Sequence, residues 1–87
     1  MSGGLPDNLR HLRLFLALSG KGSLSAAAAL MGLSQPAASQ ALAALERRAG
    51  GPLFARRMSG ALTPRGLALQ PRVVRAFAIL DQGFADL

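Results

Sequence analysis

The sequence predicts a mainly α-helical fold with a helix-turn-helix at its centre. The 87 residues include 17 leucines and 17 alanines, whereas only four residues are β-branched. Leucine and alanine favour helices, and β-branched residues favour strands. Residues 34–48 have the pattern of a capped amphipathic helix, and a short apolar helix over residues 24–31 precedes them across the tight link Gly32-Leu33. In a helix-turn-helix the second helix enters the DNA major groove by its N-terminal residues.

The first predicted helix begins after Asp7 or Asn8, either of which can serve as its N-cap, and runs to about Ser19. We expect its buried side to carry Leu9, Leu12, Phe15 and Leu16. Leu14 and Leu18 point elsewhere, which predicts that other elements cover this helix on two sides.

Serine caps are expected at the next two helices. Ser23 or Ser25 caps the second helix, and Ser34 caps the third. Pro36 lies in the first turn of the third helix, where a missing N–H costs nothing. At about 100° per residue, the buried stripe of this helix comprises Ala38, Leu42, Leu45 and Ala49. The opposite, exposed stripe comprises Pro36, Gln40, Ala43 and Arg47, with Ser39 on its flank.

A short β-hairpin, or wing, is predicted next. Residues 53–57 and 61–62 flank the turn Met58-Ser59-Gly60. Thr63-Pro64 then opens a last helix, as an N-cap followed by proline at the first helical position. Pro71 falls inside that helix, where the lost hydrogen bond costs about 3 kcal/mol or more. We therefore expect a kink, or a break and restart, near Gln70.

The charge distribution favours an anionic partner and no enzymatic site. Ten basic residues oppose four acidic ones, for a net charge of +6, and seven arginines with no carboxylate lie between Arg47 and Arg75. Arginine suits bidentate contacts to phosphate and guanine, although a solvated arginine surface would look the same. One histidine, no cysteine and scattered carboxylates form no recognisable acid–base pair, triad or metal cluster. No apolar stretch approaches the ~20 residues of a membrane span, so we expect a cytoplasmic, nucleoid-associated protein without membrane contact.

Five motifs occur in order at specific spacings. They are a first helix with Leu12 and Phe15, then Gly22-Ser23-Leu24-Ser25 with Ala27-Ala28, then Ser34-Gln35-Pro36-Ala37-Ala38-Ser39 with Leu45-Glu46, then Gly50 to Arg56, and lastly Leu62-Thr63-Pro64-Arg65-Gly66. On these motifs the chain resembles the DNA-binding domain of LysR-type transcriptional regulators over nearly its whole length from Leu9 onward. Arg65 departs from the family, which usually has alanine at that position.

The resemblance implies a winged helix-turn-helix that pairs as a homodimer through its last helix on a pseudo-palindromic double-stranded DNA operator. It also implies that an effector domain, absent from this chain, would bind a small co-inducer, so no cofactor is expected here. The expected organisation is a flexible arm over residues 1–6, a DNA-binding domain over residues 7–63 and a linker and dimerisation helix over residues 64–87. An alternative is a basic module that docks an acidic protein or an anionic membrane.

The third helix and the wing supply the candidate DNA contacts. Gln35 and Gln40 can read adenine bidentately, although they could be ordinary exposed glutamines. Ser34 and Ser39 are short donors for phosphates or base edges, although Ser34 could serve only as the cap. Pro36 and Ala37 offer apolar contact to thymine methyl groups.

Four further residues are candidates for contacts beside the third helix. Arg56 and Arg57 begin the wing turn and are expected to reach the DNA backbone or the minor groove. Ser23 and Ser25 could donate to phosphate at a helix N-terminus, although capping alone explains them. His11 lies on the exposed side of the first helix and is given no role.

The last helix carries an apolar seam at alternating intervals of four and three residues, formed by Leu69, Val73, Ala76, Leu80, Gly83 and Leu87. A second stripe comprises Val74, Phe77 and Phe84. Such a spacing is typical of a coiled-coil seam, and a small core can hardly cover both stripes. We therefore expect dimerisation through Leu69, Val73, Ala76, Phe77 and Leu80. The alternative is that both stripes pack on the domain's own core.

Overall fold

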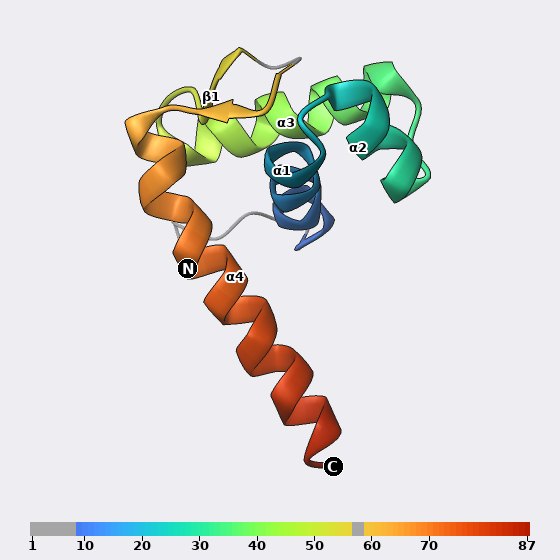
Figure 1. The fold of residues 1–87 in the computed structure, drawn as a ribbon, viewed down its shortest axis with the longest axis vertical. Coiled ribbons are helices and arrows are strands. Elements are labelled where there is room, and N and C mark those ends of the chain that lie inside the picture. Colours follow the sequence, from blue (N-terminus) through green and yellow to red (C-terminus); the bar gives the residue numbers. More distant parts are fainter. Residues whose placement is uncertain (1–8, 57–58) are drawn as a thin grey trace.

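The described residues form four helices and one antiparallel hairpin, and α1 contacts α2, α3 and α4. The computed structural model describes residues 9–56 and 59–87 (Figure 1). Its elements in chain order are α1 (Leu9–Lys21), α2 (Leu24–Met31), α3 (Gln35–Ala49), β1 (Phe54–Arg56), β2 (Ala61–Leu62) and α4 (Pro64–Ala85). This arrangement confirms the mainly α-helical, winged helix-turn-helix prediction. The proposed caps Asp7 and Asn8 and the arm over residues 1–6 lie outside the described residues.

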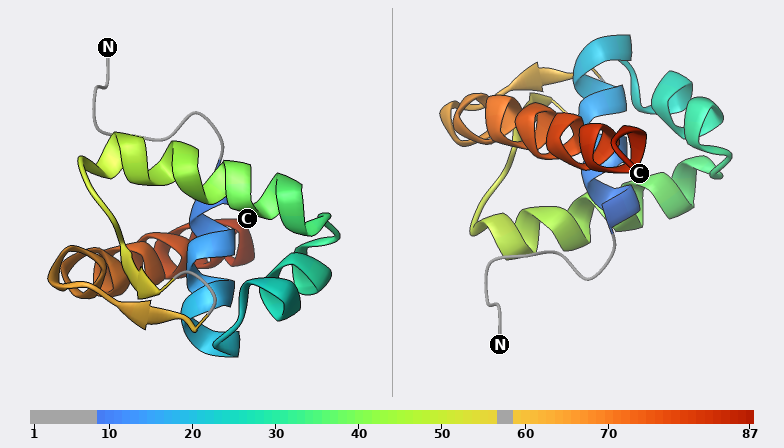
Figure 2. Two further views of the ribbon diagram at one scale, coloured as in Figure 1. Left: turned by 90° about the horizontal axis from the view of Figure 1, so that it is seen from above. Right: turned by 90° about the horizontal axis from the view of Figure 1, so that it is seen from below.

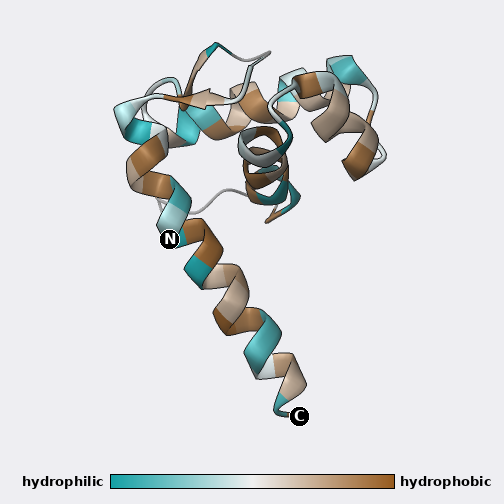
Figure 3. Cartoon of the chain, in the orientation of Figure 1, coloured by the Kyte–Doolittle hydropathy of each residue, from teal (hydrophilic) through white to brown (hydrophobic). Residues whose placement is uncertain are grey.

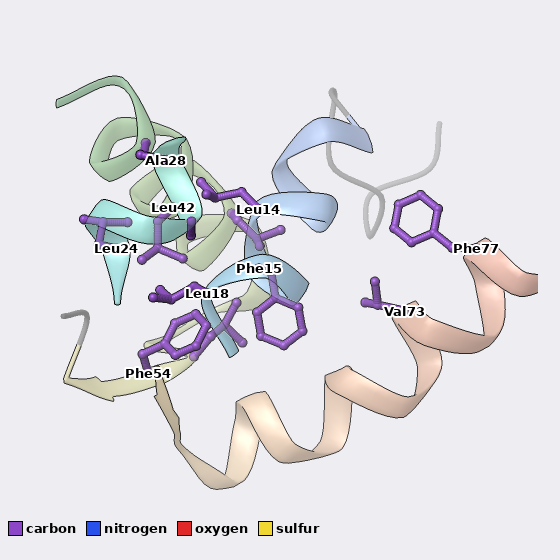
Figure 4. Close-up of a cluster of buried hydrophobic side chains, with 13 residues drawn as sticks. Leu14, Phe15, Leu18, Leu24, Ala28, Leu42, Phe54, Val73 and Phe77 are labelled. Carbon is purple, nitrogen blue, oxygen red and sulfur yellow. The ribbon is translucent and has the colours of Figure 1, made fainter. Parts of the chain in front are cut away.

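Helix α1 is the centre of the core and is covered on more than one side, as the sequence predicts, but Leu9 of its predicted buried side is exposed. Leu14, Phe15 and Leu18 are fully buried (Figure 4). Leu9 is 50% exposed. Leu12 and Leu16 are only partly buried against the core. The physical reason is that α1 packs against three helices at once, so residues on several sides of it are covered. Figure 2 shows α1 between α3 on one side and the hairpin on the other.

The turn between α2 and α3 is fixed by a left-handed glycine. Gly32 has φ 69°, and its N–H donates to the carbonyls of Ala28 and Ala29 at the end of α2. The next N–H, from Leu33, donates to the carbonyl of Ala28 at 2.9 Å. Because only glycine adopts this φ without strain, the residue sets the direction in which α3 leaves the turn.

The hairpin is held close to the junction between α1 and α2. Phe54 pairs with Leu62 and Arg56 with Ala61, so the register shifts by one residue on β1, as in a β-bulge. Gly60 has φ 73°, and a Cβ atom there would collide with the carbonyl oxygen of Leu18. A glycine at this position therefore lets the returning strand lie against the end of α1.

Helix α4 is continuous through Pro71, so the predicted break and restart is wrong. Thr63 caps its N-terminus by accepting from the N–H of Gly66 at 3.1 Å. The ribbon instead changes direction in its orange first half (Figure 1), as expected where proline displaces the carbonyl of Leu67. Gln70 donates to the hydroxyl of Ser19 at 3.2 Å, which holds this part of α4 on α1.

Candidate nucleic-acid interface

The N-terminus of α3 has the predicted cap. The hydroxyl oxygen of Ser34 accepts a hydrogen bond from the N–H of Ala37 at 3.2 Å, and Pro36 lies in the first turn. Ser34 is itself exposed, so the residue can cap the helix with its oxygen and also donate its O–H outward. The capping prediction is confirmed, and a contact from Ser34 to DNA stays a prediction.

The two faces of α3 are divided as the sequence predicts. Ala38, Leu42 and Leu45 are buried in the core, and Ala49 is half-buried. The candidate contact residues on this helix are exposed or half-buried: Ser34, Gln35, Pro36 and Gln40 are exposed, and Ala37 and Ser39 are half-buried. The core thus holds one side of α3 and leaves a side of small and amide-bearing residues accessible.

A hollow of about 340 Å³ lies between the first turn of α1 and the N-terminal half of α3. Its lining residues are Arg10, His11, Leu33, Ala37, Gln40 and Ala41. Arg10 donates from its guanidinium to the carbonyl oxygen of Met31 at 3.0 Å, which ties the start of α1 to the end of α2. The sequence analysis gives His11 no role because it places the residue on the exposed side of the first helix, whereas in the structure His11 is half-buried and its turn borders α3.

The start of α2 lies beside the wing. Ser23 is half-buried and caps α2 by accepting from the N–H of Ala26 at 3.0 Å, whereas Ser25 is exposed. A Cβ atom on Gly22 would lie 3.6 Å from the carbonyl oxygen of Ser59 in the wing turn. The fold therefore brings the two serine candidates and the wing to the same part of the surface.

The wing presents Arg56 at the exposed end of β1. Its carbonyl oxygen accepts from both the N–H and the hydroxyl of Ser59, each at 3.1 Å, which closes the turn. The carbonyl is therefore fixed, while the guanidinium is on the surface. Arg57, the second wing candidate, lies outside the described residues.

Two charged side chains near the C-terminal end of α3, Glu46 and Arg65, make hydrogen bonds that stabilise the fold. The carboxylate of Glu46 accepts from the N–H of Leu53 at 2.8 Å and so fixes the strand that enters the wing. The guanidinium of Arg65 donates to the carbonyl oxygen of Ala49 at 2.7 Å. Arg65 thus stabilises the C-terminal end of α3 with a cationic partner, which the helix dipole favours.

The predicted dimerisation seam is divided by the fold. Val73 and Phe77 are 4% and 8% exposed because they pack on the chain's own core, and Leu69 is half-buried there (Figure 4). The guanidinium of Arg13 on α1 lies 4.2 Å above the centre of the Phe77 ring. The expectation that Val73 and Phe77 are available to a partner is therefore wrong, because α1 already covers them.

Both apolar stripes of α4 continue beyond the core and are exposed there. Leu80 is 45% exposed and Phe84 76% exposed, whereas Ala76 is a small exposed residue between the two halves. Figure 3 shows brown, apolar positions along the part of α4 that projects away from the other helices. The alternative that both stripes pack on the domain's own core is wrong as well, because α4 is longer than the core it crosses.

Neither a metal site nor a membrane span is found in the described part of the chain. Over residues 9–56 and 59–87, no three His, Asp or Glu side chains gather in a set that could hold a metal ion. None of the helices described there is long and apolar enough to cross a membrane.

Comparison with known proteins gives one consistent result. A family model described as "Bacterial regulatory helix-turn-helix protein, lysR family" matches residues 9–67. The transcriptional activator protein LysR of Escherichia coli K12 is 43% identical over 77 residues, which cover 86% of this chain and 24% of that protein. The transcriptional regulator CbbR of Xanthobacter flavus is 38% identical over 84 residues, which cover 91% of this chain and 25% of that protein.

Solved structures agree with the sequence relatives. VV2_1132, a LysR family transcriptional regulator, superposes with a TM-score of 0.84 at 31% identity over 99% of this chain and 29% of that one. An OxyR mutant of Corynebacterium glutamicum gives a TM-score of 0.82 at 32% identity over 94% of this chain and 26% of that one. The first curated relatives are matched over only 17% to 19% of their own length.

Proposed function

The chain belongs to the lysR family of bacterial regulatory helix-turn-helix proteins, and we propose that it reads a specific DNA operator by placing the N-terminal half of α3 in the major groove. Membership makes it a DNA-binding domain of the transcriptional-regulator class. The observation that carries the finer proposal is the exposed amide of Gln40 on a helix whose other side is held by Ala38, Leu42 and Leu45. A glutamine presented on a rigid helix suits bidentate recognition of adenine.

The residues beside α3 supply contacts that position the domain. Arg56 and Arg57 of the wing contact the DNA backbone or the minor groove, and Ser25 donates to phosphate from the start of α2. The hydroxyl oxygen of Ser23 accepts the capping hydrogen bond, and its O–H can still donate a hydrogen bond to a phosphate. These contacts add affinity without reading sequence.

The domain acts as a homodimer through the projecting part of α4. Exposed leucine and phenylalanine side chains at Leu80 and Phe84 supply the apolar surface, because Val73 and Phe77 are used by the core. A two-fold pair of domains would present two copies of α3 to half-sites about 34 Å apart, or one turn of DNA. This geometry suits a pseudo-palindromic operator.

Duplex binding measured against salt concentration tests the proposal. The chain is titrated with an operator duplex, selected by the chain itself from a randomised pool, and with a scrambled duplex of equal length. We expect the logarithm of the association constant to fall with that of salt concentration by roughly 0.9 for each phosphate neutralised. We also expect the selected duplex to bind more tightly than the scrambled one at every salt concentration.

The matched probes are a polyglutamate peptide and vesicles containing anionic lipid. If either binds at least as tightly as the selected duplex, and the two duplexes bind equally, the domain is a general basic module instead. Binding to duplex that is flat in salt would also contradict the proposal.

A further inference from the structure

We propose that the first turn of α1 is a second phosphate-binding edge of the interface, at which Arg10 and His11 contact the DNA strand on the side of α3 away from the wing. The inference rests on the proposed function and names residues to which neither the sequence motifs nor the family match assigns a role. Its ligand is a backbone phosphate of duplex DNA.

Helix α3 has two distinct flanks. At about 100° per residue, Ser39 and Glu46 lie on one flank, and Ala37 and Ala41 lie on the other. Glu46 accepts from the N–H of Leu53, which marks its flank as the one facing the wing. Ala37 and Ala41 line the hollow beside α1, which marks theirs as the flank facing the first turn of that helix.

Gln40 lies on the side of α3 that borders the first turn of α1. It is exposed, and it borders the same hollow as Arg10 and His11. In Figure 1 the hairpin passes above α3, whereas the blue N-terminal end of α1 lies below it. A strand of DNA beside Gln40 on this lower side would therefore meet the first turn of α1, not the wing.

The DNA major groove is about as wide as α3 with its side chains. The major groove is about 12 Å wide and an α-helix with its side chains is about 10–12 Å across, so a helix in the groove has a phosphate backbone on each side. In the proposed function, the wing and the start of α2 contact one of the two DNA backbones that border the groove. The first turn of α1 is positioned to contact the other DNA backbone.

The chemistry of the hollow suits a phosphate. Among the described residues that line it, none is acidic, and Arg10 brings a permanent positive charge. The bond from Arg10 to the carbonyl oxygen of Met31 holds that charge at the rim. His11 is half-buried on the same turn, and an imidazole donates an N–H in its neutral and its protonated form alike.

The test combines two variants with modified DNA. Arg10→Ala and His11→Ala are compared with the unaltered chain on the selected duplex and on a series of duplexes in which single phosphates are replaced by neutral methylphosphonates. We expect each variant to weaken binding roughly fivefold on selected and scrambled duplexes alike, equivalent to about 1 kcal/mol. For Arg10→Ala the salt slope should also fall by about 0.9.

The decisive readout is the loss of sensitivity at one phosphate. A methylphosphonate that weakens DNA binding by the unaltered chain should hardly change the affinity of the variants, because the side chain that contacts that phosphate has already been removed. Arg10→Lys, which keeps the charge, should retain most of the salt slope. Arg72→Ala removes an equal charge from the exposed surface of α4 and should leave the phosphate pattern unchanged.

Thermal unfolding followed by circular dichroism shows whether Arg10→Ala, which loses its bond to Met31, remains folded. His11→Ala breaks no hydrogen bond described for the fold and provides an independent variant. If both variants keep the unaltered chain's methylphosphonate pattern, this inference is overturned while the proposed function stands. If the unaltered chain itself binds duplex without salt dependence, the proposed function fails first.

Discussion

Arg65 donates a hydrogen bond at 2.7 Å to the carbonyl oxygen of Ala49, and this bond joins the first turn of α4 to the last turn of α3. The guanidinium also lies over Gly51, where a Cβ atom would come within 2.9 Å of its Nε atom. In this chain an arginine therefore adds a direct tie between the proposed reading helix and the proposed dimerisation helix.

Arg65→Ala should destabilise the chain by about 1 kcal/mol, because a helix-terminal carbonyl loses a charged hydrogen-bond partner. The free energy of unfolding, measured by urea titration, checks this value. Arg75→Ala is a matched control, since Arg75 is also an exposed arginine on α4. Equal effects of the two substitutions would show that the bond to Ala49 contributes nothing specific.

Gly66→Ala and Gly83→Ala should change stability in opposite directions. A Cβ atom on Gly66 would collide with the carbonyl oxygen of Leu53, whereas nothing lies within 4 Å of a Cβ atom on Gly83. Overpacking costs about 1–3 kcal/mol, and alanine in an exposed helix gains up to about 1 kcal/mol over glycine. Melting temperatures of the two variants measure the difference. A Gly66→Ala variant as stable as the unaltered chain would contradict the close packing of α4 on the loop before the wing.

Gln40→Ala and Arg56→Ala should affect DNA recognition differently. Loss of a bidentate glutamine should remove about 1–3 kcal/mol of discrimination at one base pair, whereas loss of a backbone contact should weaken all duplexes alike. Affinities for a panel of single-base operator variants distinguish these patterns. If Gln40→Ala leaves the relative affinities for the operator variants unchanged, the proposed orientation of α3 in the groove is wrong.

Leu80→Asp combined with Phe84→Asp should give a folded monomer with much weaker operator binding. Both side chains are exposed in the single chain, so charge there opposes pairing without entering the core. Val73→Asp, by contrast, should unfold the domain, because Val73 is buried against α1. Sedimentation at high concentration and far-ultraviolet circular dichroism separate the two outcomes. An unaltered chain that stays monomeric both free and on its operator would contradict dimerisation through α4.

Local signals in the sequence were sufficient to predict the helix-turn-helix. Ser34 and Pro36 mark the start of α3, and the spacing of Ala38, Leu42 and Leu45 predicts the side that the structure buries. Thr63 likewise marks the start of α4. These features depend on hydrogen bonds and periodicity within a few residues, so they can be recognised before the position of any other element is known.

What surrounds each helix was decided only by the tertiary structure. The burial of Leu14 and Leu18 agrees with the predicted cover of the first helix on two sides, but the sequence does not show that α2, α3 and α4 supply that cover. Pro71 remains inside a helix because packing of α4 on α1, including the bond from Gln70 to Ser19, supports the chain on both sides of it. Similarly, the apolar seam of α4 is uniform in sequence, but the end of the core determines that Val73 is covered and Leu80 is exposed. Burial depends on contacts between residues distant in sequence, and those contacts exist only after the chain has folded.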